Sequence, residues 1–172
     1  RVGAPTLSAI ACEMCLAGEI KQLARIAVVD ERMKLVIDEL VRPEMAVTDY
    51  LTRYSGITAE LLQTARISAA DARAKLLALL RDASSPVVLV GHSLENDLQA
   101  LGVAHDSVLD TALLYPLQIR SSGPPCKAPL RALALRYLGR AIQRSTSGHD
   151  PREDASAAME LALLKLSRGH GF

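Results

Sequence analysis

Three acidic residues and one histidine stand in segments whose residue types could bind divalent metal ions. They are Glu13 in the segment AIACEMC, Asp97 in GHSLENDLQAL, and His149 and Asp154 in GHDPREDA. Hydrolysis of a phosphodiester needs charge neutralisation at the attacking and leaving oxygens, and two divalent ions about 4 Å apart provide it when carboxylates hold them. A histidine beside such a cluster can take a proton from water near neutral pH. Together these residues indicate a two-metal nuclease site.

Position 11 breaks this pattern. Residues two apart on a β-strand face the same side, so an aspartate at 11 and a glutamate at 13 would place two carboxylates together, but the pair here is Ala11 and Glu13. Each acid alone has a plainer interpretation: Glu13 as a surface acid, Asp97 as a solvated helix residue, and Asp154 as a first-turn carboxylate that the helix dipole favours. His149 alone could be an ordinary loop residue. It is the combination that favours a metal site.

The pattern of apolar residues predicts one mixed sheet with helices on its faces. Five strands are expected, at Leu7–Cys12, Leu23–Val29, Lys34–Leu40, Val87–Val90 and Val108–Leu109. The first three follow one another closely, which favours an antiparallel meander, and the later strands alternate with helices. Helices are expected after the cap at Ser68, where Asp71 completes a capping-box variant, then at Ser93–Leu101, Asp110-Thr111, Leu130–Leu138 and Glu153–Leu166, with a loop at Ile119–Lys127.

Composition limits the class of protein. A chain of 172 residues fits one domain with a sizeable core, and no apolar run approaches the ~18 residues of a membrane span. A net charge of +1 gives no global basic field, so local basic residues must attract any nucleic acid. Aromatic residues make up only 3%, which argues against stacking many bases on a sheet. The start at Arg1, without an initiator methionine, leads us to expect a domain cut from a longer protein or a processed chain.

Three cysteines, an odd number, argue against a disulfide framework and favour a reducing compartment. Cys12 and Cys15 form a C-x-x-C pair, but a zinc site usually needs a second pair of ligands, and none stands at suitable spacing. We therefore interpret both residues as small buried hydrophobic side chains near a strand end.

Six segments resemble, in order and over nearly the whole chain, the motifs of the DEDD-type 3′→5′ exonucleases with a catalytic histidine. More narrowly, they resemble the eukaryotic RNA exonuclease branch. The segments are AIACEMC, DELVRP, DYLTRYSGIT, LVGHSLENDLQAL, VLDT and GHDPREDA, the last with the H-x-x-x-x-D spacing of the third motif. The resemblance implies an α/β, RNase H-like fold with a mixed five-stranded sheet flanked by helices, in a single exonuclease domain over 1–172. It also implies two Mg²⁺ or Mn²⁺ ions, single-stranded RNA 3′ ends as the substrate, and a nuclear, including nucleolar, location.

The same resemblance implies roles for the site residues. Glu13, Asp97 and Asp154 correspond to metal ligands and His149 to the general base, whereas Ala11 stands where the family carries the aspartate that touches both ions. Loss of that carboxylate should weaken both metal sites and misplace the attacking water. An engineered Asp→Ala replacement would leave the other motifs intact, as they are here, and we favour it. The alternative is a natural pseudonuclease that binds RNA 3′ ends or a protein partner without cleavage.

Substrate contacts are expected from the backbone of Met14 and Cys15 at the last ribose, from Ser55-Gly56-Ile57 beside the terminal nucleotides, and from Leu94 in a base pocket. Plainer interpretations stay open. The first is a turn in which Gly56 supplies an unusual φ and Thr58 caps a helix, and the second is helix-to-sheet packing by Leu94.

Basic residues gather late in the chain, at Arg120, Lys127, Arg131, Arg136, Arg140 and Arg144. The spacing of four from Arg136 through Arg140 to Arg144 predicts one basic helical face that could follow phosphates, although it could equally be a solvated face. His92 is expected to orient a turn by hydrogen bonding, and Asp110 to cap a helix.

Overall fold

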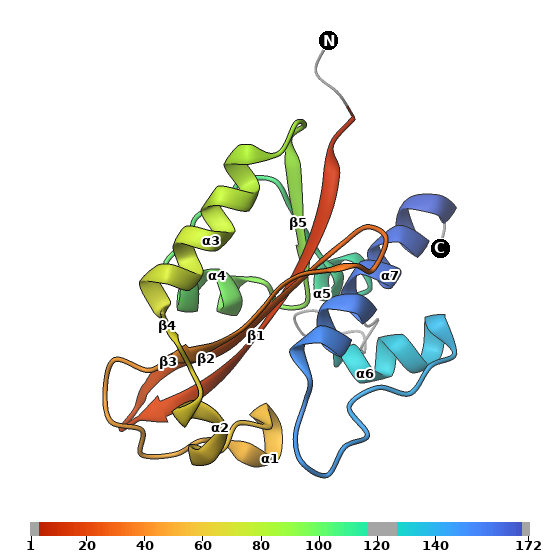
Figure 1. Cartoon of the computed structure of the whole chain (residues 1–172). Coiled ribbons are helices and arrows are strands. Elements are labelled where there is room, and N and C mark those ends of the chain that lie inside the picture. The colour runs from red at the N-terminus through yellow and green to blue at the C-terminus, as the bar shows by residue number, and fades with distance from the viewer. Residues whose placement is uncertain (1–3, 117–126, 170–172) are drawn as a thin grey trace.

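In a computed structural model, residues 4–116 and 127–169 are described, and they form a mixed α/β fold around one sheet (Figure 1). The sheet has six strands in the order β4-β3-β2-β1-β5-β6. Their bounds are β1 Thr6–Ala17, β2 Ile20–Asp30, β3 Leu35–Arg42, β4 Ile67–Ser68, β5 Val87–Gly91 and β6 Val108–Asp110. The mixed sheet is confirmed, but the expected number of five strands is wrong. The missed strand, β4, has only two residues and therefore shows no alternating pattern.

The first three strands form the expected antiparallel meander. The turn between β2 and β3 is held by the Asp30 carboxylate, which accepts hydrogen bonds from the backbone N–H groups of Arg32 and Lys34. On the other side of β1, the strands β5 and β6 run parallel to it. β1 therefore lies inside the sheet and, at Thr6–Ala17, is longer than the predicted strand Leu7–Cys12.

Helices cover both faces of the sheet (Figure 1). One core cluster joins Ile10, Ile26 and Val28 of the sheet to Ala72, Leu76 and Leu101 of the helices α3 (Ala69–Asp82) and α4 (Glu95–Leu101). A second joins Ala9, Val29 and Val90 to Ala155, Ala158 and Met159 of α7 (Pro151–Arg168). Because side chains alternate along a strand, Ala9, Ala11 and Glu13 of β1 face α7.

Local capping fixes where the longer helices begin. The Ser68 hydroxyl accepts a hydrogen bond from the Asp71 N–H, and the Asp71 carboxylate accepts one from the Ser68 N–H, which confirms the predicted capping box of α3. The remaining described helices are short: α1 Thr52–Ser55, α2 Ala59–Gln63, α5 Thr111–Leu114 and α6 Leu130–Leu133. Within the described residues, no helix is both long enough and apolar enough to cross a membrane.

The predicted helix at Leu130–Leu138 is present as α6 followed by a π-helical turn, η1 (Ala134–Leu138), which ends at Gly139 with φ +64°. Arg140 and Arg144 lie beyond that end, so the predicted basic helical face shared with Arg136 is wrong. Arg136 lies over the Tyr137 ring, and Arg140 pairs with Glu160 of α7. Residues 119–126 of the expected loop, with Arg120, lie outside the described residues.

Candidate active site

The site begins where two parallel strands separate. β1 pairs with β5 only over Thr6–Ala9, and β5 ends at Gly91. Beyond this point the backbone N–H of Cys12 donates to the carboxylate of Asp97 at 2.8 Å instead of to a strand. Asp97 lies in the first turn of α4, just past the carboxyl end of β5, where sites of α/β sheets collect. The helix thus delivers a carboxylate to the same stretch of β1 that carries Ala11 and Glu13.

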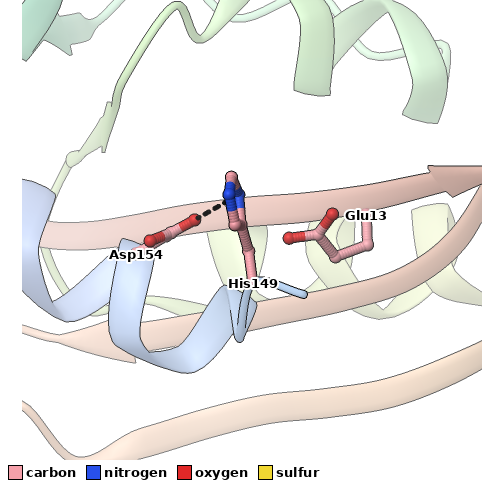
Figure 2. Close-up of side chains that lie close together, drawn as sticks. All are labelled: Glu13, His149 and Asp154. Carbon is pink, nitrogen blue, oxygen red and sulfur yellow. Dashed lines mark ion pairs between the residues drawn. The ribbon is translucent and has the colours of Figure 1, made fainter. Parts of the chain in front are cut away.

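The other half of the site comes from the start of α7. Asp150 caps this helix by accepting a hydrogen bond from the Arg152 N–H, and Pro151 occupies the first turn, where its missing N–H costs nothing. Asp154 lies in the same first turn and points toward the sheet, with His149 between it and Glu13 (Figure 2). His149 comes directly before the cap, so the sequence spacing of five places its ring beside Asp154.

Glu13, His149 and Asp154 each offer one ligand atom, and these atoms lie within 4.8 Å of one another. Figure 2 shows the imidazole between the two carboxylates, with His149 Nδ1 3.8 Å from Asp154 Oδ2. That separation permits an ion pair only when the histidine is protonated. Asp97 is not in this trio, although its charge helps to raise the pKa of Glu13. The structure therefore brings all four predicted residues into one region and three of them into ligand range.

Burial disfavours the ionised forms of the Glu13, Asp97 and Asp154 carboxyls. It raises the pKa of Glu13 to about 8, with further contributions from the charges of Asp154 and Asp97. It also raises the pKa of Asp97 to about 7, against the hydrogen bond from Cys12, and that of Asp154 to about 6. A bound cation would stabilise the three carboxylates, because it favours their charged forms against the burial that raises their pKa values. Carboxylate oxygens suit Mg²⁺ or Mn²⁺, so this donor set fits a divalent metal.

The surroundings of His149 favour its neutral form. Burial and the charge of Arg131 lower its pKa below 6.5, while Glu153 acts in the opposite direction. A neutral imidazole at pH 7 can accept a proton. Ala11 faces the same side of β1 as Glu13 and packs with the second core cluster. Its methyl group cannot bind a metal ion, so position 11 contributes no ligand.

The residues at 55–57 that were predicted to contact substrate also stabilise the fold. The Ser55 hydroxyl donates to the Tyr50 carbonyl and accepts from the Ile57 N–H, and Thr58 caps α2. Gly56 has φ +67°, as the turn interpretation expected. Ile57 is 1% exposed and packs in a cluster with Cys15, and its predicted contact with the terminal nucleotides stays a prediction.

Backbone contacts of Met14 and Cys15 with a ribose stay predictions, as do phosphate contacts of Arg136 and Arg140. Leu94 is 2% exposed and packs on Gly91, where an added Cβ would lie 2.7 Å from Leu94 Cδ1. Its packing role is confirmed, and its place in a base pocket stays a prediction.

Asp110 and His92 perform the supporting roles expected of them. The Asp110 carboxylate caps α5 through the Ala112 N–H and also accepts hydrogen bonds from Ser93 and Leu94, which fixes the turn that leads into α4. His92 Nδ1 lies 3.0 Å from the Thr111 hydroxyl. These bonds position the helix that carries Asp97.

Two features of the site were missed by sequence reasoning. The side-chain amide of Gln143 donates to both carboxylate oxygens of Asp154. Arg25, opposite Glu13 on β2, is hydrogen-bonded to Asp38 and lies 3.6 Å from Asp150. The charged residues Arg25, Asp38 and Asp150 were visible in the sequence. Only the register of β2 and β3 brings them close to the loop that carries His149.

Comparisons with known proteins agree with this fold and with a nuclease domain. Residues 15–162 match the model of the family described as Exonuclease (RNase_T). The chain is 41% identical over 162 residues to Exonuclease GOR of Pan troglodytes, 44% over 159 residues to RNA exonuclease 5 of Homo sapiens, and 38% over 171 residues to RNA exonuclease 1 of Saccharomyces cerevisiae. These matches cover 94%, 92% and 99% of this chain but 23%, 20% and 30% of those proteins. The chain therefore spans less than a third of the length of these relatives.

Solved structures with the same fold include exonuclease-bearing units of Pan2. The Saccharomyces cerevisiae Pan2 pseudoubiquitin hydrolase-RNA exonuclease module, in complex with AAGGAA RNA, matches with a TM-score of 0.79 at 28% identity, covering 95% of this chain and 29% of that one. The Neurospora crassa Pan2 catalytic unit matches with a TM-score of 0.79 at 25% identity, covering 98% and 29%. Because the family match extends over residues 15–162, this chain belongs to the exonuclease (RNase_T) family.

Proposed function

We propose that this domain is a 3′→5′ exoribonuclease of the DEDD type with a catalytic histidine, held in an impaired state by Ala11. The observation that carries the proposal is the convergence of Glu13, His149 and Asp154, whose ligand atoms lie within 4.8 Å of one another although they come from two distant parts of the chain. Surface acids or a lone helix-dipole carboxylate would not be expected to converge with a histidine in this way.

RNA as the substrate is supported by the relatives. Two of them are named RNA exonucleases, and the Pan2 module with this fold is described in complex with RNA. Because the chain spans only part of those proteins, their activities come to this chain as a proposal. We propose the 3′ end of single-stranded RNA as the end that enters the site, and a nuclear location, on the motif resemblance described above.

The chemistry follows from the residues present. Glu13, Asp97 and Asp154 would hold divalent ions, which would supply charge neutralisation at the phosphate oxygens. Burial and Arg131 keep His149 neutral near pH 7, so it can take the proton from an attacking water. The positive charge of Arg131, which helps to lower the pKa of His149, would also attract the phosphates of an RNA. The hydrogen bond from Cys12 holds Asp97 at the edge of β1, where the separated strands leave room for it.

Ala11 favours a second candidate. Without a carboxylate at position 11, the site could retain RNA 3′ ends, or serve a protein partner, while cutting slowly or not at all. In that case the chain would be a binding domain with a nuclease fold. The two candidates differ in one testable respect, which is whether the remaining residues form a competent site once the missing carboxylate is supplied.

The test is the variant Ala11→Asp, with Ala11→Asn as the matched control that has a similar shape but no charge. With Mn²⁺ and a 5′-labelled single-stranded RNA, Ala11→Asp should shorten the RNA stepwise from the 3′ end, and its rate should rise by on the order of 10²–10⁴ over the parent chain. The basis is that metal-ion stabilisation supplies several kcal/mol and each ~1.4 kcal/mol is tenfold. Ala11→Asn should stay near the parent.

A 3′-phosphorylated RNA should resist the Ala11→Asp variant, whereas a 5′-phosphorylated one should not, which tests the polarity. If the folded Ala11→Asp protein binds RNA but cleaves no faster than the parent, the exonuclease proposal fails and the binding domain is favoured. Shortening from the 5′ end would overturn the proposed direction.

A further inference from the structure

Gln143 makes a contact that is directed at one candidate metal ligand. Its side-chain nitrogen Nε2 lies 3.0 Å from Asp154 Oδ1 and 3.1 Å from Asp154 Oδ2, so the amide donates symmetrically to the carboxylate. The Asp154 side chain is 13% exposed, and water has little access to it. A buried carboxylate needs donors to fix its orientation and offset its lost hydration. The Gln143 amide is such a donor for Asp154.

The backbone around Gln143 is built to present this side chain. Gln143 has φ +56°, a left-handed conformation that is uncommon and strained for a residue other than glycine. Its backbone N–H donates to Glu153 Oε2 at 2.8 Å. Glu153 and Asp154 are neighbours on α7. Glu153 therefore holds the backbone of Gln143, while the side-chain amide of Gln143 holds Asp154. Strain of this kind persists where surrounding contacts determine it and is often found at functional sites.

A third contact fixes the segment against α7. Ile142, next to Gln143, is 4% exposed and packs with Ala157 and Leu161 of that helix. The loop between η1 and α7 is therefore anchored on the same helix that carries Asp154. The amide of Gln143 is held in place by packing and by hydrogen bonding, and its distance to the carboxylate is set by both.

We propose that Gln143 is a positioning residue that holds the Asp154 carboxylate toward Glu13 and His149, so that divalent metal binds to a preoriented ligand. This inference rests on the proposed function, because it presupposes that Asp154 is a metal ligand. In this role Gln143 acts through Asp154 and not on the substrate itself. Its effect should appear in metal affinity, since loss of a residue that orients a ligand typically costs roughly 10–100-fold in affinity or activity.

The test measures binding of Mn²⁺ alone, by the loss of the free-ion electron paramagnetic resonance signal, with no RNA present. Gln143→Met keeps the length of the side chain but removes the donor, and it should lower Mn²⁺ affinity roughly 10–100-fold. Gln143→Gly should show a similar loss, although glycine adopts positive φ without strain. The control Gln63→Met makes the same chemical change at an exposed position at the end of α2 and should bind Mn²⁺ like the parent.

A purely structural role is separated by thermal unfolding in EDTA. Gln143→Gly should unfold at or above the parent temperature while still losing affinity, which a residue that only stabilises the fold would not do. In the Ala11→Asp background, the activity lost in Gln143→Met should return as Mn²⁺ is raised. If Gln143→Met does not fold, Gln143→Gly decides the matter by the same measurements.

Asp154→Asn distinguishes failure of this inference from failure of the proposed function. If Asp154→Asn loses Mn²⁺ binding but both Gln143 variants bind as tightly as the parent, or more tightly, Gln143 does not position the ligand. If Asp154→Asn itself binds Mn²⁺ like the parent, Asp154 is not a ligand, and the metal site of the proposed function fails with this inference.

Discussion

The backbone N–H of His149 donates to the carbonyl oxygen of Tyr54 at 2.7 Å. This bond ties the loop before α7 to helix α1, whose last residue, Ser55, begins the Ser55-Gly56-Ile57 turn. Beside it the two backbones touch, because a Cβ on Gly148 would lie 2.1 Å from the Gly56 nitrogen. The candidate general base and the segment proposed to meet the terminal nucleotides are thus held together without a side chain between them.

Gly148→Ala should break this contact. Gly148 has φ +103°, and a methyl group there would collide with the backbone of Gly56 and Thr52. The matched control is Gly139→Ala, which also has positive φ (+64°) but open space around the added Cβ. Both should pay the backbone strain of roughly 1–2 kcal/mol, and Gly148→Ala should lose clearly more. Thermal unfolding measures the difference. In the Ala11→Asp background only Gly148→Ala should also reduce cleavage, and equal losses at the two positions would argue against the contact.

Metal stoichiometry should reflect the missing carboxylate. The parent chain should bind one divalent ion weakly through Glu13 and Asp154, and Ala11→Asp should bind two, because the family resemblance assigns position 11 to both ions. Titration with Mn²⁺, followed by calorimetry or paramagnetic resonance, counts the sites. Two fully occupied ions about 4 Å apart in the parent chain would show that position 11 does not have this role.

His149→Ala, in the Ala11→Asp background, should lower the cleavage rate while leaving RNA affinity nearly unchanged. Proton removal from water matters in the transition state, and general-base catalysis contributes roughly 10²–10⁴. The deficit should shrink at high pH, where hydroxide is more available. Asp154→Asn serves as the contrast, since losing a ligand should shift the Mn²⁺ dependence itself. Retention of more than about a third of the activity by His149→Ala, against the much larger loss that general-base catalysis implies, would exclude the histidine as the base.

Stability without metal should fall as pH rises. Burial raises the pKa of Glu13 to about 8, that of Asp97 to about 7 and that of Asp154 to about 6, whereas carboxyls of an unfolded chain titrate near 4. Between pH ~4 and ~8 these three carboxyls therefore bind more protons in the folded state than in the unfolded state. The stabilisation from these protonated acids is present below the unfolded pKa and is lost as pH rises through the folded values.

Thermal unfolding in EDTA should show this as a lower Tm at pH 8.5 than at pH 5.5. A change of 1 kcal/mol moves Tm by roughly 2–4 °C for a domain of 150–250 residues, so a shift of a few degrees is measurable. Mn²⁺ should restore Tm at the higher pH, because it binds the ionised carboxylates. Glu13→Gln should flatten the dependence, and a Tm that rises with pH in EDTA would contradict the assigned burial.

Local patterns in the sequence were sufficient for much of this protein. Three short apolar stretches that follow one another closely predicted the meander of β1, β2 and β3. The Ser68 and Asp110 caps were predicted from residues that satisfy backbone groups within a few positions. The spacing from His149 to Asp154 predicted that their side chains lie close together, because only one helix cap and one helix turn separate them. These features depend on contacts that are short along the chain, which is why the residues alone specify them.

Other features were decided by contacts between distant segments. β4 is too short to show a pattern and exists because it pairs with β3. The spacing of four from Arg136 through Arg140 to Arg144 predicted one helical face. The helix ends at Leu138, because Gly139 leaves the helical conformation there. Burial of Ile57 and Leu94 comes from the packing of α1, α2 and α4 on the sheet. The bond from Gln143 to Asp154 needs a left-handed residue in a loop held against α7, and only the packing of that loop on the helix brings the amide to the carboxylate.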